Sequence, residues 1–291
     1  APATAAGGPP DADETAEDFE RRMDEQLEAA PSGRRVVSFE RDGARYTGEQ
    51  WDGGVRFKGR IAYPDGGEYE GEALNGERHG QGKMIYASGG EYEGEWRNDK
   101  RHGEGRAVAP NGNVYDGAFQ NDERHGQGRY EFVEGGWYDG EWRAGGFHGE
   151  GARAWANGDV YEGDWVDGAA QGRGVKTWAV RDWRYDGEWR GGERHGEGAM
   201  TYSEEESYVG GWRRDKRHGR GEYIWPSGER YKGDWVDGRR EGEGRFVFEN
   251  GDIYEGAWRL DRRDGLGTLT DATGRQRRSV WRMDREIQRV E

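Results

Sequence analysis

Tyr92-Glu93-Gly94-Glu95-Trp96, followed by His102-Gly103-Glu104-Gly105, is one copy of a pattern that recurs along most of the chain. Its tyrosine has a counterpart every 23 residues, with a single step of 24. The tyrosines of this series are Tyr46, Tyr69, Tyr92, Tyr115, Tyr138, Tyr161, Tyr185, Tyr208, Tyr231 and Tyr254. A constant period of this length is the signature of a stacked repeat architecture. A residue that recurs at one position of the repeat is therefore predicted to be structural.

The pattern within a repeat, numbered from its tyrosine, indicates two strands. Positions 1, 3 and 5 are aromatic, glycine and aromatic, and positions 14, 16 and 18 repeat the alternation. Period-two alternation is typical of strands with one buried face. Asn111-Gly112, Asn157-Gly158 and Asn250-Gly251 supply turn residues that accept positive φ. We expect an all-β fold over residues 36–276: an elongated, single-layer antiparallel solenoid of about ten stacked β-hairpins, one per tyrosine.

The two ends depart from the pattern. Residues 1–35 predict a flexible arm and an acidic amphipathic helix over 11–30, with Phe19, Met23 and Leu27 on one stripe. This helix is read either as a cap on the first repeat or as an arm that docks on a partner. Residues 277–291 predict a degenerate repeat, with Trp281 in the tryptophan position, and a short capping helix, because Met283, Ile287 and Val290 have helical spacing.

Composition favours a thin protein with an aromatic seam. Hydrophobic residues make up 31%, charged residues 35%, and the net charge is -15, which alone would indicate disorder. Disordered chains are poor in aromatic residues, however, whereas this chain has 14 Trp and 15 Tyr. The lack of cysteine excludes disulfides and thiol catalysis. The acidity argues against nucleic acid and anionic lipid surfaces.

No catalytic, cofactor-binding or metal-binding residues are expected. All six histidines occupy position 11 and would lie two strands, about 9–10 Å, apart, which is too far to share a zinc ion. The H-G-x-G runs are not followed by a helix, as phosphate-binding loops require. Acid pairs such as Glu70/Glu72 and Glu93/Glu95 recur on the solvated strand face and lack the unique environment of a catalytic carboxylate.

The units Tyr69-Glu70-Gly71, Tyr92-Glu93-Gly94-Glu95-Trp96 and Arg101-His102-Gly103-Glu104-Gly105 resemble MORN repeats (membrane occupation and recognition nexus) over about four fifths of the chain. The resemblance implies a twisted antiparallel sheet of stacked hairpins with a concave groove. It also implies that the groove or the ends of the array bind proteins, including helical peptides. Ciliary radial-spoke, junctophilin, lipid-kinase and cytoskeletal proteins carry such repeats, so the fold alone does not define an activity.

We therefore expect a non-catalytic scaffold that binds a helical or extended segment of a partner protein and assembles as a homodimer or within a larger complex. A peripheral phospholipid-binding module and the regulatory fragment of a larger enzyme are the alternatives. The resemblance favours a cytoplasmic or cytoskeletal setting, such as a ciliary axoneme. The start at Ala1 looks processed and leaves an organelle complex, for example in a plastid, open.

Two sets of residues are candidate contact sites. Aromatic residues at positions 5 and 18 are predicted to line the partner groove: Trp96, Phe119, Trp142, Trp165, Trp189, Trp212, Trp155 and Trp178. The second set lies where the repeat gains a residue and two turns lack glycine, between residues 179 and 207. Its members are Trp183, Glu204, Glu205 and Glu206. Departures from a repeat are positions where specific function is expected.

Overall fold

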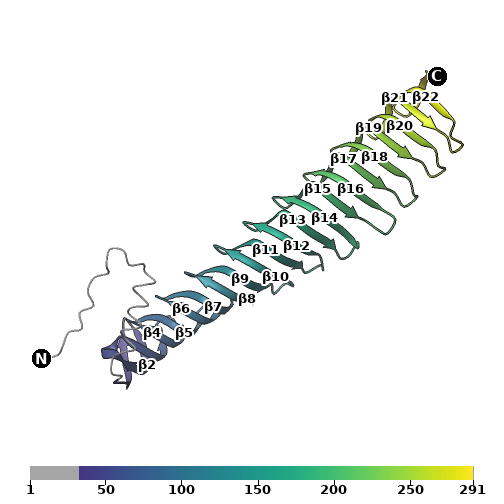
Figure 1. The fold of residues 1–291 in the computed structure, drawn as a ribbon. Helices are drawn as coiled ribbons and strands as arrows, with labels where there is room; N and C mark the ends of the chain where they lie inside the picture. Colours follow the sequence, from purple (N-terminus) through teal and green to yellow (C-terminus); the bar gives the residue numbers. More distant parts are fainter. Residues whose placement is uncertain (1–32, 291) are drawn as a thin grey trace, which may run out of the picture. The chain divides into compact units, whose positions relative to one another are not determined.

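The computed structural model describes residues 33–290, and these divide into two compact units between residues 105 and 106. The helix predicted over residues 11–30, with Phe19, Met23 and Leu27, lies outside the described residues. In both units the strands follow one another in chain order as antiparallel hairpins (Figure 1). The all-β hairpin architecture predicted from the tyrosine period is therefore confirmed.

The first unit contains six strands and a short 3-10 helix within its described residues. They are β1 (Arg35–Arg41), β2 (Ala44–Trp51), η1 (Asp52–Gly54), β3 (Arg56–Ala62), β4 (Glu68–Leu74), β5 (Glu77–Ile85) and β6 (Glu91–Arg97). Each strand pairs with the next one along the chain. Strand β7 (Lys100–Val108) spans the division between the units.

The second unit contains hairpins of similar length. Its strands are β8 (Val114–Gln120), β9 (Glu123–Glu131), β10 (Gly136–Arg143), β11 (Gly146–Trp155), β12 (Val160–Val166), β13 (Ala169–Trp178), β14 (Trp183–Arg190), β15 (Glu193–Thr201), β16 (Ser207–Arg213), β17 (Lys216–Ile224), β18 (Arg230–Val236), β19 (Arg239–Val247), β20 (Ile253–Arg259), β21 (Arg262–Thr270), β22 (Gln276–Arg282) and β23 (Arg285–Arg289).

Tight two-residue turns close the hairpins after the tryptophan position. Both turn residues have positive φ, as in Asp237-Gly238 and Asn121-Asp122, which is the geometry of type I′ turns. Leu260-Asp261 adopts the same conformation, although a leucine is disfavoured there. The repeat period therefore sets the turn position even where the local sequence is a poor match for the turn.

A row of glycines crosses the strands of the second unit. Gly140 pairs with Gly151 within one hairpin, and Gly151 pairs with Gly163 of the next strand. A Cβ atom on Gly140 would lie 2.5 Å from the Cα atom of Gly151, so a side chain has no room. The register shifts directly after Gly140, which places a β-bulge in the middle of the hairpin.

The period tyrosines lie on this glycine row. The Tyr138 side chain is fully buried, and a Cβ atom on Gly151 would lie 2.5 Å from its hydroxyl oxygen. That hydroxyl donates a hydrogen bond to the bulge carbonyl of Glu141 at 2.8 Å. The same bond recurs at Tyr161, at 3.1 Å, and at Tyr208, at 2.9 Å. A ring over paired glycines is thus how a one-layer sheet buries apolar surface.

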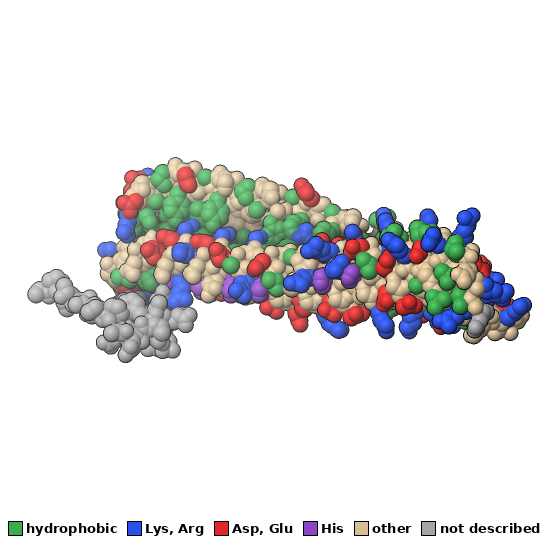
Figure 2. Space-filling model, turned by 90° about the horizontal axis from the view of Figure 1, so that it is seen from above, with side chains coloured by type: hydrophobic (Ala, Val, Ile, Leu, Met, Phe, Trp, Pro, Cys, Tyr) green, Lys and Arg blue, Asp and Glu red, His purple; other side chains and the backbone are tan. Residues whose placement is uncertain are grey.

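The short capping helix predicted after the degenerate repeat, within residues 277–291, is wrong, because strands β22 and β23 occupy residues 276–289. Met283 and Asp284 form another two-residue turn with positive φ, so the hairpin period overrides the helical spacing of the apolar residues. Ile287 is 54% exposed. Lys and Arg side chains gather at the end that these strands form (Figure 2). Exposed positive charge on an edge strand discourages pairing with another sheet.

Replacing Gly151 by alanine is expected to destabilise the second unit by about 1–3 kcal/mol, since the methyl group must displace the Tyr138 ring. The matched control is Gly146→Ala in the same strand, where the nearest atom would be 3.7 Å away. Neither glycine needs the left-handed region, so the comparison isolates packing. Denaturant unfolding measures both variants. Equal stability of the two would contradict the role given to the glycine row.

Alkaline pH is expected to unfold the protein, and the buried tyrosines should ionise together as it unfolds. Burial raises the pKa of Tyr254 from 10.0 to about 12. Since the folded pKa is the higher one, the stability that this group contributes is complete below pH 10. It is lost between pH 10 and about 12, by up to about 1.4 kcal/mol per pH unit. Burial raises the pKa of Tyr138 and Tyr231 in the same direction. Tyrosinate absorption and circular dichroism should change together; gradual ionisation near pH 10 in a folded chain would contradict this.

Candidate functional site

The strands of the second unit present two faces of different chemistry. Positions 1, 3, 5, 14, 16 and 18 of each repeat form what we call the aromatic face. Alternate positions carry mainly charged side chains and form the charged face. In β14, for example, Trp183, Tyr185 and Trp189 lie on the aromatic face, while Arg184 and Asp186 lie exposed on the other. Candidate contact residues must be judged by their depth within the aromatic face.

Aromatic residues at position 5 are core residues. Trp96, Phe119, Trp142, Trp165, Trp189 and Trp212, which were predicted to line a groove, have exposed fractions between 3% and 6%. The indole N–H of Trp142 donates to the carbonyl of Gly128 in the preceding hairpin at 2.8 Å, and that of Trp165 donates to Gly151 at 3.0 Å. Their burial leaves little ring surface for a partner and assigns them to the contact between successive hairpins.

In most repeats an arginine covers the ring of the tryptophan at position 5 of the next repeat. The guanidinium carbon of Arg217 lies 4.3 Å from the centre of the Trp235 ring, and that of Arg194 lies 4.4 Å from Trp212. Arg194 also donates to a carboxylate oxygen of Asp215 at 2.8 Å, in the turn of the next hairpin. Further pairs are Arg78 with Trp96, Arg124 with Trp142, Arg240 with Trp258 and Arg263 with Trp281.

The arginine at position 10 could have been predicted, because it recurs with the same period as the tyrosine. Three of the ten repeats lack it, and the first of these, which starts at Tyr46, has Val55 at this position. Phe147 replaces it over Trp165 and stacks on Tyr138 with ring centres 3.8 Å apart. Ala170 replaces it before Trp189 and is too short to cover the ring.

Aromatic residues at position 18 are only half-buried and form what we call the rim row. In the second unit these residues are Phe132, Trp155, Trp178, Tyr202, Trp225 and Phe248. Trp155 and Trp178 are therefore the two predicted groove residues that retain exposed ring surface. Because each ring comes from a different hairpin, successive rings recur about every 9–10 Å across the strands.

The irregular region between residues 179 and 207 adds to the rim row. Trp183 pairs with Trp178 across the strands and packs edge-on against Tyr202 with ring centres 5.2 Å apart. Glu206 accepts a hydrogen bond from the Tyr223 hydroxyl. Glu204 and Glu205 lie exposed in the turn. The structure thus brings Trp183 and Glu206 to the aromatic face and leaves the other two acids outside it.

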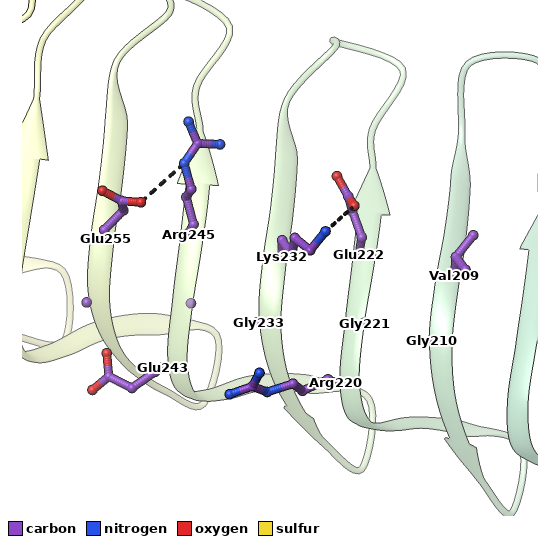
Figure 3. A pocket seen from close by; sticks show the side chains of 12 residues that line it. Val209, Gly210, Arg220, Gly221, Glu222, Lys232, Gly233, Glu243, Arg245 and Glu255 are labelled. Atoms are coloured by element: carbon purple, nitrogen blue, oxygen red, sulfur yellow. Dashed lines mark hydrogen bonds and ion pairs between the residues drawn. The ribbon is translucent and has the colours of Figure 1, made fainter.

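The charged face holds a groove of about 650 Å³ along strands β16–β20, with the glycine row as its floor (Figure 3). Its walls carry ion pairs between Lys232 and Glu222, at 3.3 Å, and between Arg245 and Glu255, also at 3.3 Å. These charges neutralise one another, so the groove presents no uncompensated charge at these four residues to a ligand.

Nine segments of the chain, between residues 69 and 274, match the family model described as MORN repeat. The chain belongs to the MORN-repeat family. The matched segments begin at Tyr69, Tyr92, Tyr115, Tyr138, Tyr161, Tyr185, Tyr208, Tyr231 and Tyr254. The hairpin that starts at Tyr46 lies outside them.

No curated protein matches the sequence. Among solved structures, the chain is similar to the TCP domain of Drosophila melanogaster SAS-4 in complex with a proline-rich motif of Ana2, at 12% identity, a TM-score of 0.32 and coverage of 69% of this chain and 90% of that one. It is also similar to the Danio rerio CPAP TCP10 domain in complex with a STIL peptide, at 11% identity, a TM-score of 0.33 and coverage of 88% and 99%. Likenesses at this level carry no conclusion about function.

The polar residues that recur in the MORN repeats support the bulge. The Glu188 carboxylate accepts a hydrogen bond from the Glu197 N–H at 3.1 Å, and Asp164 accepts one from Arg173 N–H at 2.9 Å. The carbonyl of His148 lies 3.3 Å from the Tyr138 hydroxyl. Within residues 33–290, no group of three or more His, Asp or Glu side chains is placed to hold a metal ion. None of the helical structure in that range has the length and apolarity needed to cross a membrane.

Restoring the missing arginine is expected to stabilise the MORN array. In Ala170→Arg the new guanidinium can cover Trp189 and donate to the carbonyl of Gly192. The backbone there matches that of Arg217, since Gly192 N–H donates to Ala170 O at 2.9 Å as Gly238 N–H does to Arg217 O. The expected gain is about 0.5–2 kcal/mol in unfolding free energy. Arg217→Ala should lose a similar amount; a loss in both variants would argue against the stacking role.

Proposed function

We propose that this MORN-repeat protein is a non-catalytic scaffold that binds a segment of a partner protein along the rim row and joins a larger assembly. The observation that carries the proposal is the row of half-buried rings, which continues across six hairpins of the second unit. Tryptophan and tyrosine are the residues that most often dominate binding energy at interfaces. Aromatic strips that a protein leaves uncovered usually mark such interfaces.

The rim row is a better contact surface than the rest of the aromatic face. The rings at positions 1 and 5 are already occupied by glycines, carbonyls and arginines, as at Tyr138 and Trp142. A helical or extended segment laid across the strands can touch several rim rings, because they recur at a regular spacing. The proposed partner-binding residues are therefore Trp155, Trp178 and Trp183, together with their neighbours in the row.

A scaffold also agrees with how the polar side chains are used. The position-4 carboxylates of Glu188 and Asp164 accept hydrogen bonds from backbone N–H groups, so their role is structural. A ciliary or cytoskeletal complex is the setting we propose for the assembly, on the strength of the family resemblance. Binding to a partner segment, and not chemical turnover, is the activity to test.

The test is selection of random displayed peptides on the 291-residue chain, followed by measurement of their dissociation constants. The variant Trp155→Ala/Trp178→Ala should weaken the selected peptides by about 30-fold or more, since hot-spot residues contribute at least about 2 kcal/mol. Trp137→Ala is the matched control, because Trp137 is also half-buried but neighbours Tyr138 in the strand and so lies on the charged face.

Circular dichroism and denaturant unfolding establish that the variants keep the wild-type fold. The proposal requires selected peptides that lose affinity in the rim variant and keep it in Trp137→Ala. Failure to select any peptide, or equal affinity for both variants, would overturn the rim row as the contact surface.

A further inference from the structure

Position 16 of the repeat carries two unexpected cations. This position lies on the aromatic face, beside the tyrosine of the next strand in register, as Lys176 lies beside Tyr185. Apolar or tyrosine side chains fill it in the other repeats: Ile61, Met84, Ala107, Tyr130, Met200, Tyr223, Phe246 and Leu269. Arg153 and Lys176 are the exceptions, and they belong to consecutive repeats.

Both cations lie between rim rings. The guanidinium carbon of Arg153 is 4.4 Å from the ring centre of Phe132 and 5.2 Å from that of Trp155. The ammonium nitrogen of Lys176 is 4.8 Å from the centre of Trp155 and 5.0 Å from that of Trp178. The result is an alternating stack of ring, cation, ring, cation and ring across three hairpins.

Neither cation has a carboxylate partner within ion-pair distance among residues 33–290. The two acids that interact with Lys176 electrostatically are engaged elsewhere: Asp159 accepts a hydrogen bond from Ala179 N–H at 3.1 Å, and Asp215 pairs with Arg194 at 2.8 Å. Partial burial lowers the pKa of both Arg153 and Lys176. Partial loss of hydration without a counter-ion is unfavourable for a cation, so a carboxylate from a partner would stabilise the charge at both positions.

A cavity lined mainly by aromatic rings, with Arg124 also in its wall, adjoins this stack. It has a volume of about 250 Å³, and its lining includes Phe132, Phe147, Tyr130 and Trp142. Two of these rings also touch the first cation, since Phe132 and Phe147 lie 4.4 Å and 5.5 Å from Arg153. A side chain that enters the cavity therefore lies beside the guanidinium.

We propose that Arg153 and Lys176 form a subsite for two carboxylates of an acidic partner segment, and that an apolar side chain of the same segment enters the cavity beside Phe147. The inference rests on the proposed function and names the chemistry of the partner. Arg153 in β11 and Lys176 in β13 are separated by one strand, so the carboxylates lie about 9–10 Å apart. Three residues of extended chain or seven residues of helix span that distance.

A purely structural stack makes a different prediction. If the cations serve only to pack on the rings, their loss lowers stability and leaves peptide selection unchanged. If they serve a ligand, methionine at both positions keeps or raises stability, because Met84 and Met200 already occupy the same repeat position in a buried state. Measuring the stability and the peptide preference of this variant therefore distinguishes a structural role of the cations from a role in ligand binding.

The experiment compares peptide selection on three forms of the 291-residue chain: wild type, Arg153→Met/Lys176→Met, and Lys232→Met/Arg245→Met. The last removes the same charge from the charged face, as a matched control. Wild type and the control should select peptides rich in Asp and Glu at the spacing given above, next to a Leu, Ile or Phe. Binding of these peptides to Arg153→Met/Lys176→Met should weaken about tenfold or more, as expected for charge-assisted hydrogen bonds. Added salt should reduce the difference.

The inference is overturned if the selected peptides show no excess of acidic residues, or if they bind Arg153→Met/Lys176→Met as tightly as wild type. Peptides that depend on Trp155 and Trp178 but not on the two cations would overturn the acidic subsite alone and leave the rim row supported. Peptides that depend on neither pair would overturn both proposals.

Discussion

A tyrosine ring lying on two paired glycines is the interaction on which the rest of this molecule depends. A one-layer sheet has no second layer to cover its apolar side chains, so each ring must be buried by the sheet itself. Gly140 and Gly151 make this feasible, because the absence of both Cβ atoms lets the Tyr138 ring lie against the backbone. The hydroxyl then binds the bulge carbonyl of Glu141 and fixes the ring in place. Aromatic bulk and backbone geometry thus stabilise each other within a single hairpin.

The other recurring residues follow from this arrangement. The bulge frees backbone N–H groups, and carboxylates such as Asp164 accept hydrogen bonds from them. The tryptophan joins one hairpin to the next through its indole N–H, and an arginine such as Arg217 shields its outer surface. Nearly every residue that defines the repeat therefore has a structural role. What remains for recognition are the positions where repeats differ, which are positions 16 and 18 and the turn after them.

The sequence predicted the architecture well because periodicity reports which residues are equivalent, and equivalent residues in a stacked array share one environment. Periodicity does not report depth. Trp142 and Trp155 both lie on the aromatic face, yet the first is 3% exposed and the second is half-buried, since the first packs against the preceding hairpin, where its indole N–H donates to Gly128. The prediction of a C-terminal helix was wrong for a related reason. The spacing of Met283 and Ile287 is a local signal, and the hairpin that precedes it supplies an open edge for a further strand.

Repetition also explains how a charge at an apolar position becomes informative. A single cation in a globular core cannot be compared with equivalent positions of the same chain. Here the eight other copies of position 16 show which side chains the fold requires there, and none of them is charged. Arg153 and Lys176 differ from these copies in adjacent repeats, beside Trp155 and Trp178 of the rim row. A single substitution of this kind is within the tolerance of a stacked array, because its effect stays between neighbouring hairpins. Two adjacent ones on the same strip of rings create a surface that no other part of the array repeats, and that uniqueness is what a scaffold needs in order to hold one partner in one register.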